Sequence, residues 1–158
     1  MKHYKLIAIK LLCLVLLCGC GLDESLCRSD KPVIRAMATK AISFPFPSSA
    51  KEIYYVQHAG GMQEYQLLIR FVMDAGDLEK TVEALVADHN KQMRQLALYA
   101  PLPIAEAPRS PEFKQLLPTP WWTPSAITNG YYCGSTTSRP FHVWVDVSQS
   151  TVYLCTHD

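Results

Sequence analysis

The sequence lacks an excess of charge of either sign, since 15 Lys and Arg stand against 14 Asp and Glu. A basic field that would attract nucleic acid is therefore absent, and we expect no nucleic-acid partner. Nucleophile elbows, glycine-rich phosphate loops and His-Glu metal motifs are also missing from the sequence. These absences argue against an enzyme and predict neither a cofactor nor a metal, although residues distant in sequence can still meet in a fold.

The sequence also lacks an apolar run long enough to span a bilayer, which takes about 20 residues. Its longest candidate, residues 11–22, follows Lys10 and is closed by Asp23. A buried amino-terminal helix would need polar residues at helical spacing, and the run has none. Lys2 and Lys5 form a basic head before this short run, which is the layout of an export signal. We therefore predict that residues 1–19 are a signal peptide.

The run ends in Leu17-Cys18-Gly19-Cys20, which resembles the lipobox of bacterial lipoproteins. Leu17, Gly19 and Cys20 match that pattern, and Cys18 stands where Ala or Ser is usual. The resemblance implies cleavage after Gly19, diacylglycerol on the Cys20 sulfur, and acylation of the new amino terminus by a chain such as palmitate. Several acyl chains, at about 0.8 kcal/mol per buried methylene, would hold a soluble domain on the lipid bilayer. The alternative is a secretory signal cut nearby, with Cys20 an ordinary thiol.

The same resemblance implies an address in the cell envelope, facing the periplasm. In enterobacterial lipoproteins an Asp after the lipidated cysteine favours retention in the inner membrane. Gly21 occupies that position here and so implies the outer membrane, provided that the host is didermic.

Three cysteines remain once two leave with the signal and Cys20 is lipidated: Cys27, Cys133 and Cys155. Their pairing is open, because three thiols in an oxidising compartment leave at least one unpaired. If the last three strands form a simple meander, Cys133 and Cys155 lie on its outer strands, about 9–10 Å apart, whereas a disulfide needs Cα atoms within about 7 Å. We favour the meander, so that any bridge would involve Cys27. No cysteine has a second ligand at zinc-site spacing.

The chain from residue 51 reads as a small α+β domain. Strand-like runs at 52–58 and 64–73 flank Gly60-Gly61 and predict an antiparallel hairpin. Asp74 then offers a helix cap, and His89 lies in the apolar stripe of the helix, where a core role is favoured over a ligand role. The stripe that would face the sheet comprises Leu78, Val82, Leu85, Val86, His89 and Met93.

Seven prolines between residues 99 and 124 exclude a long helix or a central strand there. Only 110–117, which begins Ser-Pro, predicts a short helix. Trp121 and Trp122 follow. They could stack on a sugar ring or anchor a partner protein, but we favour a role as a plug over the open end of a small core.

Alternation returns at 131–136, 141–147 and 151–155, with short turns between these runs. The prediction is therefore a five-stranded, mostly antiparallel sheet in ββαβββ order, with one main amphipathic helix on one face and a proline-rich excursion. The domains would be a signal peptide at 1–19, a tether and entry segment at 20–50, and a single domain at 51–158. Within the entry segment, Phe44 and Phe46 precede prolines and read as a surface clasp rather than an exposed partner motif.

The body resembles small uncharacterised bacterial lipoproteins in its general layout, and this likeness implies no activity. Our first hypothesis is a non-catalytic binding or structural protein of the envelope, whose sheet face or Trp121–Trp122 region contacts a protein or glycan. The alternative is an inhibitor or immunity-type protein that blocks a toxin or hydrolase. An enzyme ranks third and would need a pocket that joins His58 or His142 to a carboxylate.

Overall fold

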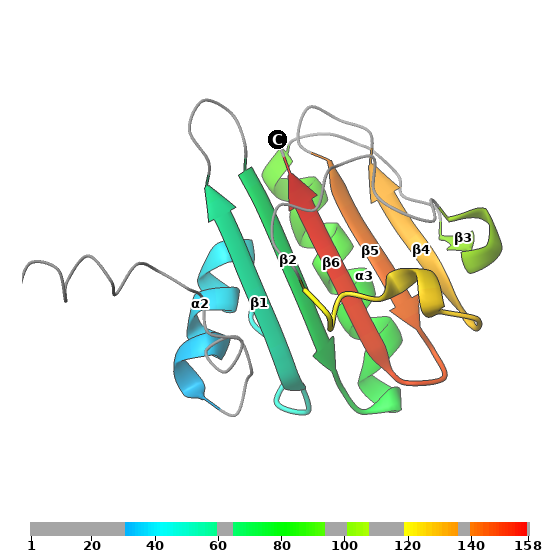
Figure 1. Ribbon diagram of the computed structural model, residues 1–158, viewed down its shortest axis with the longest axis horizontal. Helices are drawn as coiled ribbons and strands as arrows, with labels where there is room; N and C mark the ends of the chain where they lie inside the picture. The colour runs from blue at the N-terminus through cyan, green and yellow to red at the C-terminus, as the bar shows by residue number, and fades with distance from the viewer. Residues whose placement is uncertain (1–30, 60–64, 94–100, 108–118, 136–139, 158) are drawn as a thin grey trace, which may run out of the picture.

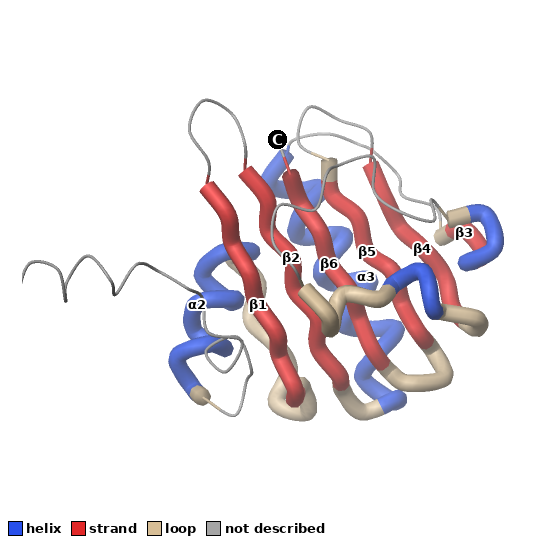
Figure 2. Tube along the Cα trace, in the orientation of Figure 1, coloured by secondary structure: helices blue, strands red, loops and turns tan. Residues whose placement is uncertain are grey.

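The computed structural model describes residues 31–59, 65–93, 101–107, 119–135 and 140–157. Six strands form one sheet in the order β1-β2-β6-β5-β4-β3, and all neighbouring strands are antiparallel (Figures 1 and 2). The elements are α2 (Pro32–Ile42), β1 (Lys51–Ala59), β2 (Tyr65–Val72), α3 (Ala75–Met93), β3 (Leu102–Pro103), β4 (Gly130–Ser135), β5 (Phe141–Asp146) and β6 (Thr151–His157).

The structure confirms an α+β fold with an antiparallel sheet, but the sheet has six strands and not the five predicted. The additional strand, β3, lies inside the proline-rich excursion and pairs only Leu102 with Tyr132 and Pro103 with Tyr131. It occupies the edge of the sheet, where the missing N–H of Pro103 removes no bond from an interior ladder. The sequence excluded a central strand here, and a two-residue edge strand left no alternating pattern to detect.

The carboxyl-terminal strand lies in the middle of the sheet. β6 pairs with β5 in a hairpin and with β2 on its other side. β2 therefore also lies inside the sheet, and its segment Leu67–Phe71 alternates between the two faces with Leu68 and Ile69 fully buried. This position fits the double-sided apolar pattern expected of a central strand.

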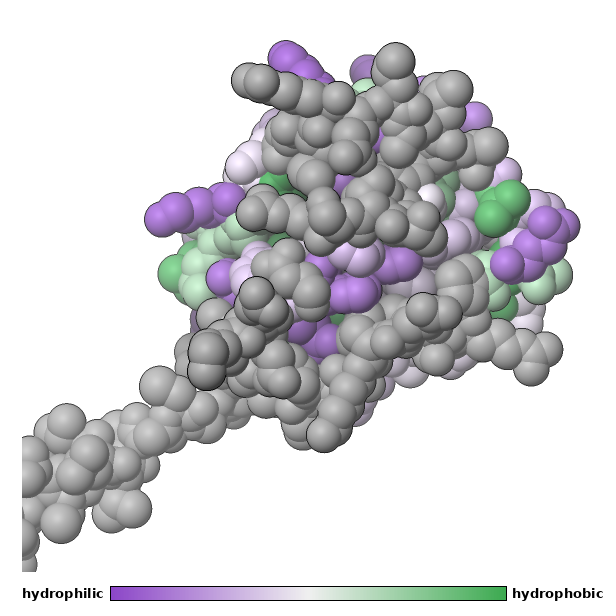
Figure 3. Space-filling model, turned by 90° about the horizontal axis from the view of Figure 1, so that it is seen from above, coloured by the Kyte–Doolittle hydropathy of each residue, from purple (hydrophilic) through white to green (hydrophobic). Residues whose placement is uncertain are grey.

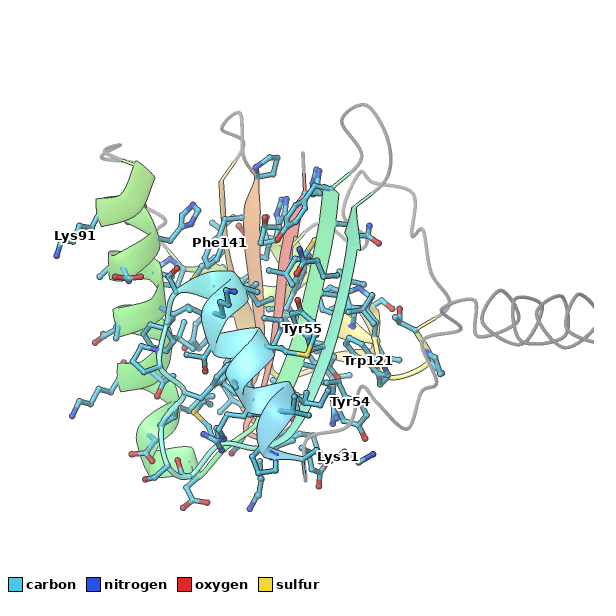
Figure 4. All side chains as sticks on the ribbon, turned by 90° about the vertical axis from the view of Figure 1, so that its left-hand side faces the viewer. Lys31, Tyr54, Tyr55, Lys91, Trp121 and Phe141 are labelled. Carbon is cyan, nitrogen blue, oxygen red and sulfur yellow. The ribbon has the colours of Figure 1, made fainter. Side chains whose placement is uncertain are left out.

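Two helices, and not one, cover the same face of the sheet, which we call the helix face (Figure 4). In α3, the predicted residues Leu78, Val82 and Leu85 are buried in the core, and Val86 is partly buried against it. The side chain of Met93 lies outside the described residues. Phe71, Val143, Val152 and Leu154 supply the sheet side of this core.

The second helix, α2, lies within the segment 20–50 that we expected to be a tether and entry segment. Pro32 is suited to the first turn of a helix, and Ile34 and Ala38 are buried at i, i+4 spacing. The helix ends at Ile42, and its C-cap residue Ser43 has a left-handed φ of 53°. Arg35 then fastens the helix to the following turn by donating to the carbonyl oxygens of Pro47, at 3.1 Å, and of Ala50.

The two phenylalanines of the entry segment lie inside the core and not on the surface as a clasp. Phe44 and Phe46 are each only 9% exposed, and Phe46 meets Phe71 edge-to-face at 4.9 Å between ring centroids. The prolines that follow keep this stretch extended, so the rings reach the core without a helix or strand to carry them. The predicted short helix at 110–117 lies outside the described residues.

The last three strands form the expected meander, with β5 between β4 and β6. Cys133 and Cys155 are buried free thiols on opposite faces, since Cys133 belongs to the helix-face core and Cys155 to the core of the other face. Burial raises the pKa of both thiols. Cys27 lies outside the described residues.

Among the residues that the structure describes, no helix has the length and apolar character to cross a membrane.

Candidate functional site

A single transverse row of large side chains crosses the face of the sheet opposite the helices. The strand register places Tyr54 of β1 beside Arg70 of β2, then Tyr153 of β6, Trp144 of β5 and Tyr132 of β4. Directly opposed residues of antiparallel strands share a face and lie about 4.5–5.5 Å apart, so these side chains form a continuous surface. We call this surface the aromatic row.

The two tryptophans singled out in the sequence lie on this row. Trp122 meets Trp144 and Tyr153 edge-to-face, at 5.8 and 5.6 Å between ring centroids, and both tryptophans pack against the buried cluster of this face. Trp121 stacks on Tyr54 at 5.3 Å with an interplanar angle of 28°. Figure 4 shows Trp121 and Tyr54 on the side of the sheet away from both helices. Trp122 therefore acts as a cover for this second core, while Trp121 lies at its margin.

The β1 end of the row combines aromatic and charged groups. The Arg70 guanidinium lies over the rings of Tyr54, at 5.3 Å, and Tyr153, at 5.8 Å. Its Nη1 is 3.9 Å from Oε2 of Glu52, and the Arg70 side chain is only 20% exposed. We call Glu52, Tyr54, Arg70 and Trp121 the β1 patch. Such a surface can stack against a sugar ring or anchor a protein side chain.

A histidine to which the sequence analysis gave no role lies beside the other end of the row. The Tyr132 hydroxyl lies 2.6 Å from Nδ1 of His142, and the His142 ring stacks on His157 at 5.7 Å and on Trp144 at 5.6 Å. Burial, followed by the nearby His157, lowers the pKa of His142 to about 4. A Cβ on Gly134 would lie 1.8 Å from the Tyr132 hydroxyl, so glycine makes room for this contact.

The enzyme hypothesis would require His58 or His142 beside a carboxylate. Within the described residues, the contacts of His142 are with aromatic rings and a phenol. His58 of β1 pairs through its backbone with Gln66 of β2, and its side chain lies outside the described residues. His89 lies flat against Phe141, at 4.0 Å between centroids, and burial lowers its pKa, as expected of a core histidine.

We expect the lowered pKa of His142 to make the domain acid-sensitive. The unfolded chain, with an ordinary histidine pKa near 6.5, binds a proton at pH values where folded His142 does not. The free energy of unfolding should therefore fall as the pH drops from about 6.5 towards 4. Because the ring is partly exposed to screening solvent, the loss should be on the order of 1–2 kcal/mol.

Urea unfolding at pH 7, 6, 5 and 4.5 measures this slope. His142→Gln should flatten it, because glutamine can still accept the Tyr132 hydroxyl and does not titrate. His89→Gln serves as the matched variant and should retain most of the slope. Equal slopes in the wild type and in His142→Gln would contradict the assignment.

A groove that the sequence analysis missed lies between α3 and the edge of the sheet near β4. Its volume is about 760 Å³ and its lining is mostly apolar. Glu79 and Glu83 lie along it one helical turn apart, and Val147 is 44% exposed. Burial, with smaller contributions from Cys133 and these two glutamates, raises the pKa of Tyr131 in the groove to about 12. Like charges at i, i+4 are unfavourable in a helix. The pair Glu79 and Glu83 was therefore the sequence feature that could have pointed to this side of α3.

A second hollow, of about 590 Å³, lies on the aromatic face. It is lined by Ile104, Ala105, Ala107, Pro124, Ser125, Ile127, Thr128 and Trp144. Within the described ranges, no three His, Cys, Asp or Glu side chains gather closely enough to hold a metal ion. Comparison of the chain with protein families, curated proteins and solved structures yields no match.

Proposed function

We propose that this chain is a lipoprotein of the bacterial cell envelope, anchored through Cys20, whose domain acts as a non-catalytic binding or structural protein facing the periplasm, on the outer membrane if the host is didermic. The observation that carries the anchor is the lipobox-like Leu17-Cys18-Gly19-Cys20 at the end of a short apolar run. Pro32, where the first described helix begins, follows Cys20 by only twelve residues. A lipid anchor at that point would hold the domain beside the bilayer.

The β1 patch supports the binding part of the proposal. Trp, Tyr and Arg are the residue types that most often dominate binding energy at interfaces, and three of the four patch residues belong to them. Trp121 and Tyr54 are half-buried, and their mutual stacking holds both rings in place before a partner arrives. Rings that are ordered in advance lose little side-chain entropy on binding. A protein segment, or alternatively a glycan, is the partner that this surface would accept.

The anchor is tested by the intact mass of the protein extracted from membranes, with Cys20→Ala as the comparison. We expect the wild type to lack residues 1–19, to carry the mass of acyl chains, and to sediment with membranes. Cys20→Ala should carry no acyl mass, because the sulfur that would bear the diacylglycerol is absent. A mature wild-type chain without acyl mass would refute the anchor and point to secretion.

The β1 patch is tested on the same extracted protein by crosslinking and co-purification. Trp121→Ala with Tyr54→Ala should abolish capture of an envelope protein or glycan, because both stacked rings are lost. Lys91→Ala is the control, since Lys91 is exposed on α3 on the helix side of the sheet. Stoichiometric capture of one soluble toxin or hydrolase would favour the inhibitor alternative. Unchanged capture by the double variant would exclude the patch.

A further inference from the structure

The outward side of α2 carries exposed apolar side chains. Val33 is 55% exposed and Met37 is 46% exposed, whereas Ile34 and Ala38 of the same helix are buried. Val33, Ala36, Met37 and Lys40 follow i, i+3, i+4 and i+7 spacing and therefore form one stripe along the helix. Seen from above, a hydrophobic patch lies at the left margin of the described surface, on the side where Figure 1 draws α2 and β1 (Figure 3).

The charged residues of α2 and of its N-cap, Lys31, are all basic. Residues 31–42 contain Lys31, Arg35 and Lys40 and no acidic residue. Arg35 is engaged with the backbone carbonyls after the helix, which leaves Lys31 and Lys40 exposed at its two ends. The region from residue 20 onward has 12 Lys and Arg against 14 Asp and Glu, so α2 is basic on a chain that is otherwise slightly acidic. An apolar stripe flanked by lysines fits an anionic lipid surface.

The proposed anchor would keep this helix close to such a surface. Pro32 is twelve positions after Cys20, and a chain of that length reaches at most about 40 Å when fully extended and about 20 Å on average. A contact too weak to recruit a free protein becomes significant when a tether makes it intramolecular.

We infer that the Val33–Met37 stripe of α2 lies against the bilayer and fixes the orientation of the domain. This inference rests on the proposed lipid anchor. Two large apolar side chains are far too few for a stable dimer, which buries about 1,000 Å² or more. A tethered bilayer contact has no such requirement, because the acyl chains supply the attachment. α2 would then face the membrane, and α3, with the groove beside it, would lie further from it.

Environment-sensitive fluorescence on the lipidated, mature protein tests this orientation. The background is Cys27→Ser, so that an NBD label enters a single introduced thiol while Cys133 and Cys155 remain buried. Met37→Cys reports on α2, and Ala84→Cys, at an exposed position on α3, is the matched control. On vesicles of phosphatidylcholine and phosphatidylglycerol we expect a blue shift and quenching by brominated lipid at position 37, and neither at position 84.

The outcomes separate this inference from the proposed function. Equal signals at positions 37 and 84 on a protein whose mass includes the acyl chains would overturn the orientation and leave the anchor intact. Absence of acyl mass would refute the anchor itself. A blue shift at position 37 that grows with protein concentration in detergent, without vesicles, would assign the stripe to a second copy and overturn the bilayer contact. An equal response on neutral vesicles would overturn the role given to Lys31 and Lys40.

Discussion

Replacing Trp144 by alanine is expected to lower the free energy of unfolding by about 3–5 kcal/mol, the usual cost of truncating a fully buried tryptophan. Trp144 is 1% exposed and lies in the aromatic row between Tyr153 and Tyr132. Trp122, Tyr132 and His142 all contact its ring, so the cavity would open beneath three neighbours at once. Urea denaturation followed by far-ultraviolet circular dichroism measures the loss.

Trp121→Ala is the comparison for this prediction, because it removes the same side chain from the margin of the row. Trp121 is half-buried and keeps one ring contact with Tyr54 and one with Trp122. Its loss should cost about 1–2 kcal/mol, in proportion to the smaller area removed from water. Equal losses for the two variants would show that the aromatic row is not organised around Trp144.

Gly130→Ala should destabilise the domain by about 3 kcal/mol, at the upper end of the cost of overpacking. A Cβ at Gly130 would lie 1.8 Å from the backbone carbonyl oxygen of Val145 on β5. A backbone oxygen within the sheet cannot rotate away as a flexible side chain can, so the strands would have to separate. The expected result is a lower melting temperature and loss of the protected amides that join β4 to β5.

Gly76 provides the opposite control within the same chain. A Cβ there meets nothing within 4 Å, and the residue lies in the first turn of α3. Gly76→Ala should therefore raise stability by up to about 1 kcal/mol through the lower entropy of the unfolded chain. A similar loss in both variants would mean that the clash at Gly130 is not what limits substitution.

Much of the sheet was predictable because its strands alternate and its turns are short. The hairpin of β1 and β2, the stripe of α3 and the meander around β5 all follow from local periodicity. The meander also predicted that Cys133 and Cys155 lie too far apart for a bridge. The strand register adds a second reason why these cysteines cannot form a bridge. Cys133 lies opposite Val143 and Cys155 lies opposite His142, so the two cysteines lie on opposite faces of the sheet.

The helix α2 was missed because its local signals are weak. It has eleven residues, and Lys31 at its start makes no side-chain capping hydrogen bond. Its stability comes from long-range contacts of Ile34 and Ala38 with the core, and from the bonds that Arg35 makes to the turn after the helix. Such contacts cannot be seen from spacing within the segment itself.

The aromatic row was missed for a related reason. Tyr54, Arg70, Tyr132, Trp144 and Tyr153 come from five strands, and only the relative register of all five places them in line. A single residue of slip in any strand would send its member to the other face. The sequence did single out Trp121 and Trp122 by composition, but it could not indicate that Trp122 covers Trp144 while Trp121 pairs with Tyr54.

The two edges of the sheet differ from its interior in one respect that bears on pairing between molecules. β1 is irregular between Lys51 and Tyr54, where Glu52 has a φ of 49°, and the opposite edge ends in β3 with Pro103. A bulge with charged neighbours and a proline each interrupt the row of free backbone groups that another strand would need for pairing. Interrupted edges would let these domains be packed densely without joining into a continuous intermolecular sheet.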